Sequence, residues 1–485
     1  MRPPNVSARR RPALRPLAAA LALVFALDGA PLAATAAPAP MPARPDTVLV
    51  TNCDDAGPGS LRDALANVAD GETVDASQLA CSVISLSTGA ILIGSQDVTL
   101  HGPGGHRLAV MGNGGTPGGG VLYDLGGGTL SVEGVDFAFG SKYRSDHAAH
   151  GGCIYSSGNL EVSDSHIYAC GVHSGSYDAS GGAVSAQGFV NLMDTHIDLC
   201  GLTTSGNARG GGVFAGGDAF LLRSTVSGCR NATGSRGYGG GVYAGGRLTV
   251  KYSTLDDNEN DEASLGFGGG GFSRGGATVY WSTISGNRAE AGGGLFLDDD
   301  GSGATVAIGD STISGNYAQS AGGVRASLPL TMHNSTVAFN ATPQATAIPI
   351  GYFPGAGLGL RGSPVTITSS IVAHNVAHGQ TDREEDIGGE LSITIDGAAN
   401  LIMDAAQPVP PDTLTDDPLL ASLQDNGGLT RTHALLPGSP AIDHGDAGTF
   451  TVDQRGPGFP RVLGAGADIG AYEVDPDRIF ANGFD

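Results

Sequence analysis

The middle of the chain repeats one pattern of apolar and polar positions about every 29 residues. Each unit begins with consecutive glycines and an apolar residue, continues with alternating apolar and polar positions, and ends on Ser-Thr-apolar followed by Asn or Cys. Apolar residues recur at every second position, which is the period of a β-strand and not of a helix. The pattern predicts short strands, among them Leu221 to Ser224, Leu248 to Lys251, Thr278 to Trp281 and Thr305 to Ile308.

The last position of each unit sets the length of the repeat. All seven steps between successive closing positions are too short for a propeller blade, and the pattern within a unit has a period of two and not 3.6. The sequence therefore predicts an all-β fold, a single right-handed parallel β-helix (a solenoid) with N- and C-terminal caps. Paired strands lie about 4.8 Å apart, so eight stacked units give a rod about 40 Å long. The closing positions are Cys170, Cys200, Cys229, Asn258, Asn287, Asn316, Asn340 and Asn375, with steps of 30, 29, 29, 29, 29, 24 and 35 residues.

Four closing residues, Asn258, Asn287, Asn316 and Asn340, are expected to face the core. Amide side chains at the same corner of consecutive coils donate to each other's carbonyl oxygens, so we expect a structural ladder and not a ligand site. Cysteines take this corner in the earlier coils. Stacked residues about 4.8 Å apart lie within the Cα range of a disulfide, so the corner also suits cross-links.

Composition adds two points to this picture. Glycine makes up 80 of 485 residues, more than twice the average of about 7%, and it clusters where the backbone must turn or lie against the next coil. The formal charge is −23, and the first 36 residues, with five Arg and one Asp, contribute +4, so the remaining residues carry −27. Such an acidic chain repels nucleic acid and anionic lipid, which argues against nucleic-acid partners.

Residues 1–36 have the pattern of a secretory signal peptide. Five arginines precede the apolar run Leu17 to Leu27, and Ala34-Thr35-Ala36 is a small-x-small cleavage site, so cleavage is expected near Ala36. Arg9-Arg10-Arg11 also allows a twin-arginine signal. No other apolar stretch reaches the length of a membrane span, so we expect no transmembrane helix and a protein that is secreted or held at the outer cell surface.

The segments outside the repeats are expected to form a linker and two caps. Residues 37–46 are a Pro-rich linker, and residues 47–110 form an N-terminal cap with the first coils, beginning with a strand and a short helix that has Ser60 as its N-cap. Residues 111–413 are the β-helix repeats. Residues 414–473 lose the repeat and gain Pro, Asp and Gly, as expected of a unit that closes the solenoid.

Six cysteines in an exported chain are an even set suited to disulfides. Cys53 and Cys81 both lie outside the repeats and are expected to pair. The other four allow three pairings, and the sequence leaves the choice open: Cys153, Cys170, Cys200 and Cys229.

Three segments resemble known exported proteins. Gly59–Ala64 is similar to the Cys-Ser-Leu-Arg-Glu-Ala signature of exported bacterial proteins, but departs from it at the Cys and the Glu. The Gly-Gly-x-apolar and Ser-Thr-Ile-Ser-Gly-Asn units resemble the right-handed parallel β-helix repeats of polymorphic outer-membrane proteins. Asn426–Asp443, with Asp453–Gly456 and Asp468–Glu473, resembles the choice-of-anchor Q domain. Together these resemblances cover most of residues 47–473 and imply an exported, surface-associated β-helix, without implying an enzyme.

Residues 474–485 form a tail. Its end, Ile479 to Asp485, resembles the short Ile-Phe-x-x-Gly-Phe-acidic tails of some exported proteobacterial proteins, and it is either a sorting tag or a disordered end without a role. The 85 residues after Asn400 are too few for the membrane barrel of an autotransporter, because each tilted strand takes about 9 to 11 residues. We therefore expect no translocator in this chain.

Parallel β-helices often host polysaccharide lyases and hydrolases, which need paired carboxylates or a base with acidic calcium ligands. The sequence has no Gly-His-Gly or Arg-x-Lys motif. Its nearest fragments, His150-Gly151-Gly152 and Asp443-His444-Gly445-Asp446, are typical of turn or cap elements, and Lys142 and Lys251 are the only lysines. The sequence therefore predicts no catalytic, cofactor-binding or metal-binding residue and no cofactor.

Two further features are candidates for binding. The acidic stretches 256–262, 298–300 and 382–386 lie on loops, but they lack the spacing of known calcium motifs and are expected to be solvated. Alternation along 277–281 places Tyr280 and Trp281 on opposite faces, so one ring points outward, either as a surface aromatic or as a platform for a sugar.

These patterns favour a secreted or cell-surface β-helix rod that acts in adhesion or as a structural surface protein, with no catalysis expected. Its expected partners are cell-surface or extracellular glycans or a host surface. The alternative is a polysaccharide lyase, a glycoside hydrolase or a carbohydrate-binding protein on the same scaffold. An enzyme should gather acidic and basic side chains in one lateral cleft, whereas a rod should show regular stacked faces.

Overall fold

The structure, a computed structural model, describes residues 47–113, 119–260, 265–343, 355–378 and 383–475. The predicted signal peptide (1–36), the whole linker (37–46) and most of the tail (476–485) lie outside the described residues. The described residues all belong to one compact unit, Pro45–Asp485. Their strands form three sheets that follow one another around each coil, and α2 (Leu61–Asn67) is the only helix among them.

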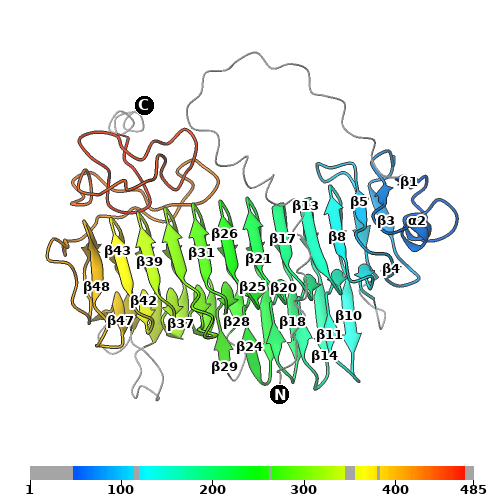
Figure 1. Ribbon diagram of the computed structural model, residues 1–485, viewed down its shortest axis with the longest axis horizontal. Helices are drawn as coiled ribbons and strands as arrows, with labels where there is room; N and C mark the ends of the chain where they lie inside the picture. Colours follow the sequence, from blue (N-terminus) through cyan, green and yellow to red (C-terminus); the bar gives the residue numbers. More distant parts are fainter. Residues whose placement is uncertain (1–46, 114–118, 261–264, 344–354, 379–382, 476–485) are drawn as a thin grey trace, which may run out of the picture. The chain divides into compact units, whose positions relative to one another are not determined.

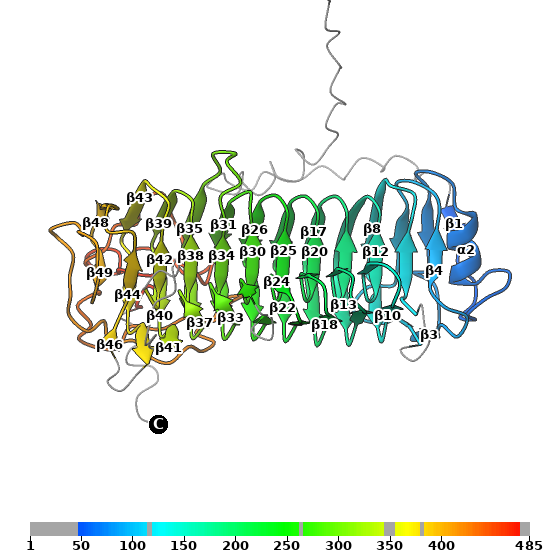
Figure 2. The ribbon, with the colours of Figure 1, turned by 90° about the horizontal axis from the view of Figure 1, so that it is seen from below.

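The smallest sheet takes one strand from each coil, so its eleven strands count the coils (Figure 2). Every strand pairs in parallel with the strand of the next coil, as in Ile154↔Val184 and Val184↔Val213. The strands are β4 (Ile91–Ile93), β7 (Leu122–Asp124), β12 (Ile154–Ser156), β16 (Val184–Ala186), β20 (Val213–Ala215), β25 (Val242–Ala244), β30 (Gly271–Ser273), β34 (Leu295–Leu297), β38 (Val324–Ala326), β42 (Leu358–Leu360) and β47 (Ile387–Gly389).

The second sheet has 15 strands and carries the candidate site described below. Its strands pair in parallel, except β45 with β46, which is antiparallel. The strands are β10 (Ser141–Arg144), β11 (Ala149–His150), β14 (Gly171–Ser174), β15 (Ala179–Ser180), β18 (Gly201–Thr204), β19 (Ala208–Arg209), β23 (Arg230–Thr233), β24 (Arg236–Tyr238), β28 (Glu259–Asn260), β29 (Leu265–Phe267), β33 (Arg288–Ala291), β37 (Tyr317–Ser320), β41 (Ala341–Pro343), β45 (Val376–His378) and β46 (Arg383–Glu384).

The third sheet has 23 strands in two ladders, which are joined because β13 and β17 run through both (Figure 1). The first ladder holds β1 (Thr47–Leu49), β2 (Thr73–Asp75), β5 (Thr99–His101), β8 (Thr129–Glu133), β13 (Asn159–Tyr168), β17 (Val190–Asp198), β21 (Ala219–Leu222), β26 (Leu248–Lys251), β31 (Ala277–Tyr280), β35 (Val306–Gly309), β39 (Leu330–His333), β43 (Val365–Thr368) and β48 (Ile395–Ala398). The second adds β3 (Val83–Ser85), β6 (Ala109–Met111), β9 (Asp136–Ala138), β22 (Thr225–Ser227), β27 (Thr254–Asp256), β32 (Thr283–Ser285), β36 (Thr312–Ser314), β40 (Thr336–Ala338), β44 (Ile371–Ala373) and β49 (Leu401–Ile402).

The predicted all-β parallel solenoid is confirmed by this topology. Every second side chain points inward, so stacked residues such as Ile154, Val184 and Val213 are fully buried in one continuous apolar core. Burial of apolar surface contributes about 25 cal/mol per Å², and the repeated Val, Leu and Ile positions therefore hold the coils together.

The glycine runs mark a corner that excludes larger residues. Gly239 has a φ of +66°, and a Cβ there would lie 2.1 Å from the carbonyl oxygen of Val242. A Cβ on Gly240 would lie 2.5 Å from the carbonyl oxygen of Gly269 in the next coil. The close stacking of backbones explains why glycine returns here in each unit.

The predicted asparagine ladder is confirmed. Asn258, Asn287 and Asn316 each donate from Nδ2 to the Oδ1 of the next ladder residue at 2.9 Å. The ladder continues through Asn340 and Asn375 and ends on the buried carboxylate of Asp386, which accepts from Asn375 Nδ2 at 2.7 Å. One of the three acidic stretches thus contributes a structural residue.

A second ladder, not predicted from the sequence, lines the corner between the two ladders of the 23-stranded sheet. Hydroxyl oxygens there accept from the backbone N–H of the preceding coil, as in Ser224 N to Ser253 Oγ at 3.0 Å. The residue just before each hydroxyl has a positive φ, so its side chain turns outward; this row contains Tyr252, Trp281, Asp310, Asn334 and Ser369.

All six cysteines form disulfides. The predicted Cys53–Cys81 pair is confirmed. Of the three pairings left open for the other cysteines, the structure has Cys153–Cys170 and Cys200–Cys229, and the latter joins the closing positions of neighbouring coils, 4.6 Å apart at Cα.

The N-terminal helix forms where the sequence predicts it. Ser60 is the N-cap of α2, and its Oγ accepts from the backbone N–H of Asp63 at 3.1 Å, which satisfies one of the free donors of the first turn. Leu61, Ala64 and Leu65 of the helix are buried against the first coils.

Residues 415–475, here named the C-terminal segment, lie along the outer face of the 23-stranded sheet (Figure 1, orange to red). We expected residues 414–473 to close the end of the solenoid, but most of this stretch instead bonds to the sides of the coils. Thr283, Thr312 and Thr336 on three successive coils all bond to it, because the row of outward hydroxyls offers partners to its backbone and to Gln454.

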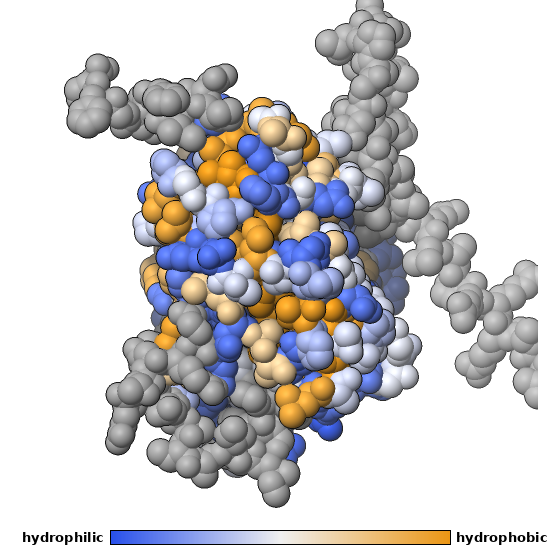
Figure 3. Space-filling view, turned by 90° about the vertical axis from the view of Figure 1, so that its left-hand side faces the viewer, coloured by the Kyte–Doolittle hydropathy of each residue, from blue (hydrophilic) through white to orange (hydrophobic). Residues whose placement is uncertain are grey.

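Seen from the C-terminal end, the surface of the described residues intersperses hydrophilic side chains with separate hydrophobic areas (Figure 3). None of the helices in the described part of the chain has the length and apolar character needed to cross a membrane.

Candidate functional site

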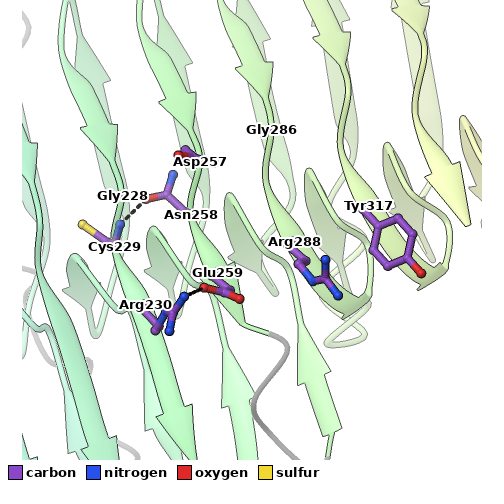
Figure 4. Close-up of a pocket in the computed structure, with 9 residues that line it drawn as sticks. All are labelled: Gly228, Cys229, Arg230, Asp257, Asn258, Glu259, Gly286, Arg288 and Tyr317. Atoms are coloured by element: carbon purple, nitrogen blue, oxygen red, sulfur yellow. Dashed lines mark hydrogen bonds and ion pairs between the residues drawn. The ribbon is translucent and has the colours of Figure 1, made fainter.

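Two adjoining cavities, here named the lateral groove, run along the 15-stranded sheet. They have volumes of about 470 and 360 Å³ and share Arg230 in their walls. The first is lined by Gly228, Cys229, Arg230, Asp257, Asn258, Glu259, Gly286, Arg288 and Tyr317 (Figure 4). The second is lined by Ser141, Gly171, Val172, His173, Cys200, Gly201, Leu202, Thr203, Arg230 and Ala232.

One row of residues runs through both cavities. Each row residue pairs in register with the next, so the row crosses seven coils, a length of about 29 Å at about 4.8 Å per step. Two members lack side chains, which hollows the face at that point. The row contains Ser141, Gly171, Gly201, Arg230, Glu259, Arg288 and Tyr317.

Charges of opposite sign alternate along the row from Arg230 to Arg288, and the aromatic ring of Tyr317 follows them. Arg230 and Glu259 form an ion pair, and the Arg288 guanidinium lies 4.8 Å from the centre of the Tyr317 ring (Figure 4). An exposed ion pair contributes only about 0–1 kcal/mol, so exchanging it for a bond to a ligand costs little. Planar guanidinium groups match carboxylate and sulfate geometry.

His173, in the wall of the second cavity, belongs to an aromatic pair. The rings of Tyr143 and His173 stack with 5.0 Å between centroids and an angle of 6°. Tyr143 is 45% exposed, so its outer face is open to a ligand. An aromatic face of this kind packs against apolar ring surfaces while its hydroxyl stays hydrated.

A second group, here named the imidazole cluster, lies on the outer face of the 23-stranded sheet in its N-terminal half. His106 Nδ1 lies 2.9 Å from Asp136 Oδ1, and His166 Nε2 lies 3.1 Å from Asp198 Oδ2. His196 follows His166 in register, with 6.3 Å between ring centroids. The hydrogen bond to Asp136 raises the pKa of His106, whereas burial lowers the pKa of His196.

The prediction that Tyr280 and Trp281 face opposite sides is wrong. Strand β31 ends at Tyr280, and Trp281 has a φ of +52°, which turns its ring outward beside Tyr280. Trp281 stacks on Tyr252 at 4.8 Å, and Phe450 of the C-terminal segment lies 6.0 Å from both Tyr280 and Trp281. Neither ring is therefore an open sugar platform while the segment is docked.

The other sequence candidates have local partners. His150 bonds to Ser180, and Asp443 accepts from the backbone N–H groups of Ala465 and Gly466, as turn and cap elements do. In the acidic stretches, Asp256 pairs with Arg431 at 2.8 Å and Asp299 accepts from Gly301 in a turn. Within the described part of the chain, no three His, Cys, Asp or Glu side chains form a group that could hold a metal ion; residues 261–264 and 379–382 lie outside it.

The sequence contains a signal for the groove that the strand pattern alone does not reveal. Six members of its row directly follow the closing Cys or Asn of a unit: Gly171, Gly201, Arg230, Glu259, Arg288 and Tyr317. Aligning the units on their closing residue brings these side chains into one column, and the column changes from glycine to charged residues at Arg230.

No family model matches the chain, and no curated protein matches its sequence. Among solved structures, the crystal structure of pectate lyase Pel9A aligns with a TM-score of 0.35 and 11% identity, over 86% of this chain and 91% of that chain. Similarity at this level carries no argument about function, and the resemblance to choice-of-anchor Q domains and polymorphic repeats stays an expectation.

Proposed function

We propose that the protein is a secreted or outer-surface rod that works in adhesion, and that its lateral groove binds an extended polysaccharide. The observation that carries this proposal is the in-register row from Ser141 to Tyr317, which presents one residue per coil along a continuous hollow. A linear polymer lying along the coils contacts each row residue in turn, whereas a compact ligand uses only part of the groove.

The chemistry of the groove supports a glycan. The Tyr143–His173 stack offers an aromatic face to a sugar ring, and Arg230 and Arg288 offer donors to hydroxyl or carboxylate oxygens. The three disulfides are consistent with the extracellular location. The signal peptide with cleavage near Ala36, the division of the chain into caps and repeats, and the role of the tail belong to the same proposal.

A binding panel tests the groove. The purified protein is incubated with plant, bacterial and host polysaccharides, with and without calcium, and bound polymer is measured. We expect at least one polysaccharide to bind, and Arg288→Ala to weaken that binding about tenfold or more, because a charged hydrogen bond contributes about 1.5–3 kcal/mol. Arg361→Ala is the matched control, since it removes an exposed arginine paired with Glu390 outside the groove. Equal loss in both variants, or no binding by the wild type, contradicts the proposal.

The imidazole cluster favours one second candidate, a polysaccharide lyase or glycoside hydrolase. His106 and His166 each lie within hydrogen-bond distance of a carboxylate on an outward face, which is an arrangement suited to general acid–base catalysis. The same panel tests this function by scoring new reducing or unsaturated ends. Product that disappears in His166→Ala while binding persists would establish the enzyme; no product from any polysaccharide would remove it.

A further inference from the structure

Six charged residues lie buried between the C-terminal segment and the coils. Each is at most 3% exposed, which is rare for ionisable groups unless they are paired. Asp310 comes from the 23-stranded sheet, at the end of β35, and the others come from the C-terminal segment. The residues, here named the buried charge cluster, are Asp310, Asp453, Arg455, Arg461, Asp468 and Glu473.

One ion pair in the cluster joins two residues of the C-terminal segment. Arg455 donates to Asp453 through Nε at 2.9 Å and Nη2 at 2.6 Å. Its guanidinium also lies 4.2 Å from the centre of the Phe459 ring and 3.9 Å from that of Tyr472. The charges of this pair cancel, so Arg461 is left as the only cation facing three carboxyl groups: Asp310, Asp468 and Glu473.

The three carboxyl groups differ in their hydrogen bonds. Glu473 accepts from the backbone N–H groups of Leu463 and Asp468 at 2.7 and 2.9 Å, and Asp468 accepts from those of Asp443 and Val474. Asp310 accepts no hydrogen bond from the described residues, and its nearest cation is Arg461 Nη1 at 3.7 Å. A fully ionised cluster therefore has more buried negative than positive charge.

Burial opposes this ionisation. It raises the pKa of Glu473 to about 7, raises that of Asp468, and raises that of Asp310 well above its usual range. The groups that face these carboxyls from the segment are Asp443, Asp453, Arg455, Arg461 and Tyr472, and from the sheet Tyr252 and Tyr280. On the sheet, Lys251 Nζ lies 5.9 Å from the centre of the Tyr280 ring, and His333, whose pKa is lowered by burial, pairs in register with Gly309.

We propose that proton uptake by the buried charge cluster holds the C-terminal segment on the 23-stranded sheet, and that loss of these protons releases the segment. Release uncovers the aromatic row of Tyr252, Tyr280 and Trp281, which the docked segment covers with Phe450. The segment is thus a pH-controlled cover over a second surface, separate from the lateral groove.

The direction of the pH effect follows from proton linkage. The docked state has the raised pKa values, so it binds more protons than the released state. Docking is at full strength below the ordinary carboxyl pKa near 4.5, weakens as pH rises, and has lost the contribution of Glu473 once pH passes about 7. Glu473 alone changes the docking equilibrium on the order of 100-fold.

The single tryptophan provides a direct probe, because Trp281 lies under the segment and its Nε1 is buried. Trp281 fluorescence is followed in urea titrations of the full chain at pH 5, 7 and 9, while circular dichroism follows the β-solenoid. We expect the fluorescence transition to occur at lower urea as pH rises, with the dichroism transition unchanged over the same range.

Glu473→Gln removes one titrating group. The change in the docking equilibrium constant with pH should therefore be smaller than in the wild type by a factor on the order of 100. Glu390→Gln is the matched control, because Glu390 is an exposed carboxylate paired with Arg361, and it should behave as the wild type. If Glu473→Gln does not fold, Asp310→Asn tests the same cluster from the sheet side. A Trp281 transition independent of pH, or one shifted equally in all variants, overturns the proposal and leaves the groove unaffected.

Discussion

The two halves of the outer face of the 23-stranded sheet are built from the same repeat but carry different side chains. At one outward position the N-terminal half has Asp136, His166 and His196, whereas the covered half has Thr283 and, in the next coils, further threonines. The covered threonines are buried and bond to the C-terminal segment; the imidazoles stay partly exposed. The apolar core restricts the residue types at inward positions only. The residue types at outward positions depend on what packs against that face.

The largest expected effect comes from a substitution in the buried charge cluster that holds the C-terminal segment on the sheet. Arg461→Leu removes the only cation near Asp310 and should lower the free energy of segment docking by about 3–5 kcal/mol. Urea titration followed by Trp281 fluorescence measures this loss. Arg361→Leu, an exposed arginine on the last coils, should change it by less than about 1 kcal/mol. Equal docking in wild type and Arg461→Leu would show that the cover does not depend on this charge.

In the open half, the Cys200–Cys229 disulfide holds neighbouring coils together, whereas in the covered half the C-terminal segment bonds to successive coils. Replacing Cys200 and Cys229 together with Ala should destabilise the surrounding coils by about 3 kcal/mol, because this disulfide closes a loop of 29 residues in the unfolded chain. Hydrogen exchange of the Gly201–Thr204 strand should become faster, while exchange in Thr283–Ser285 stays as in the wild type. Uniform acceleration in both strands would mean that the halves are not independent.

One substitution at equivalent positions compares the halves directly. Thr312→Val removes the buried hydrogen bond from Thr312 Oγ1 to Gln454 Oε1 at 2.6 Å and should cost about 1–3 kcal/mol of docking. Thr225→Val changes the same repeat position, where the side chain is only half-buried, and should cost less than about 0.5 kcal/mol. Similar losses in the two variants would contradict the contrast between covered and open coils.

The smallest effect is expected in the imidazole cluster. His166→Thr places the residue type of the covered half into the open half and removes the pair with Asp198, a surface interaction of about 0–1 kcal/mol. Thermal unfolding followed by circular dichroism should therefore change little. A loss above about 2 kcal/mol would show that the cluster is structural and would remove the main support for a catalytic role.

The sequence predicted the inward positions well because the physics there is local and repeated. A period of two marks the strands, and an amide such as Asn287 at a buried corner must find a partner, which only the next coil supplies. Cys53 and Cys81 paired as expected, since no repeat position competes for them.

The outward features were not predictable in the same way. Trp281 follows the alternation in sequence, but its positive φ turns the ring to the same side as Tyr280. The docking of Arg461 beside Asp310 joins residues about 150 positions apart, and no period marks such a contact. Arg230 and Arg288 of the lateral groove fall in one column only when the repeat units are aligned on their closing residues.

Hydroxyl-radical footprinting of the full chain at pH 5 tests most directly the claim that one face is covered and the groove is open. Radicals modify exposed aromatic side chains, and mass spectrometry gives the rate at each residue. The account predicts rapid modification of Tyr317 in the groove and of Tyr143, which stacks on the groove residue His173, and slow modification of Tyr280 and Trp281 under the segment. Equal rates at Tyr143 and Trp281 would contradict it, because the segment would then not cover the sheet.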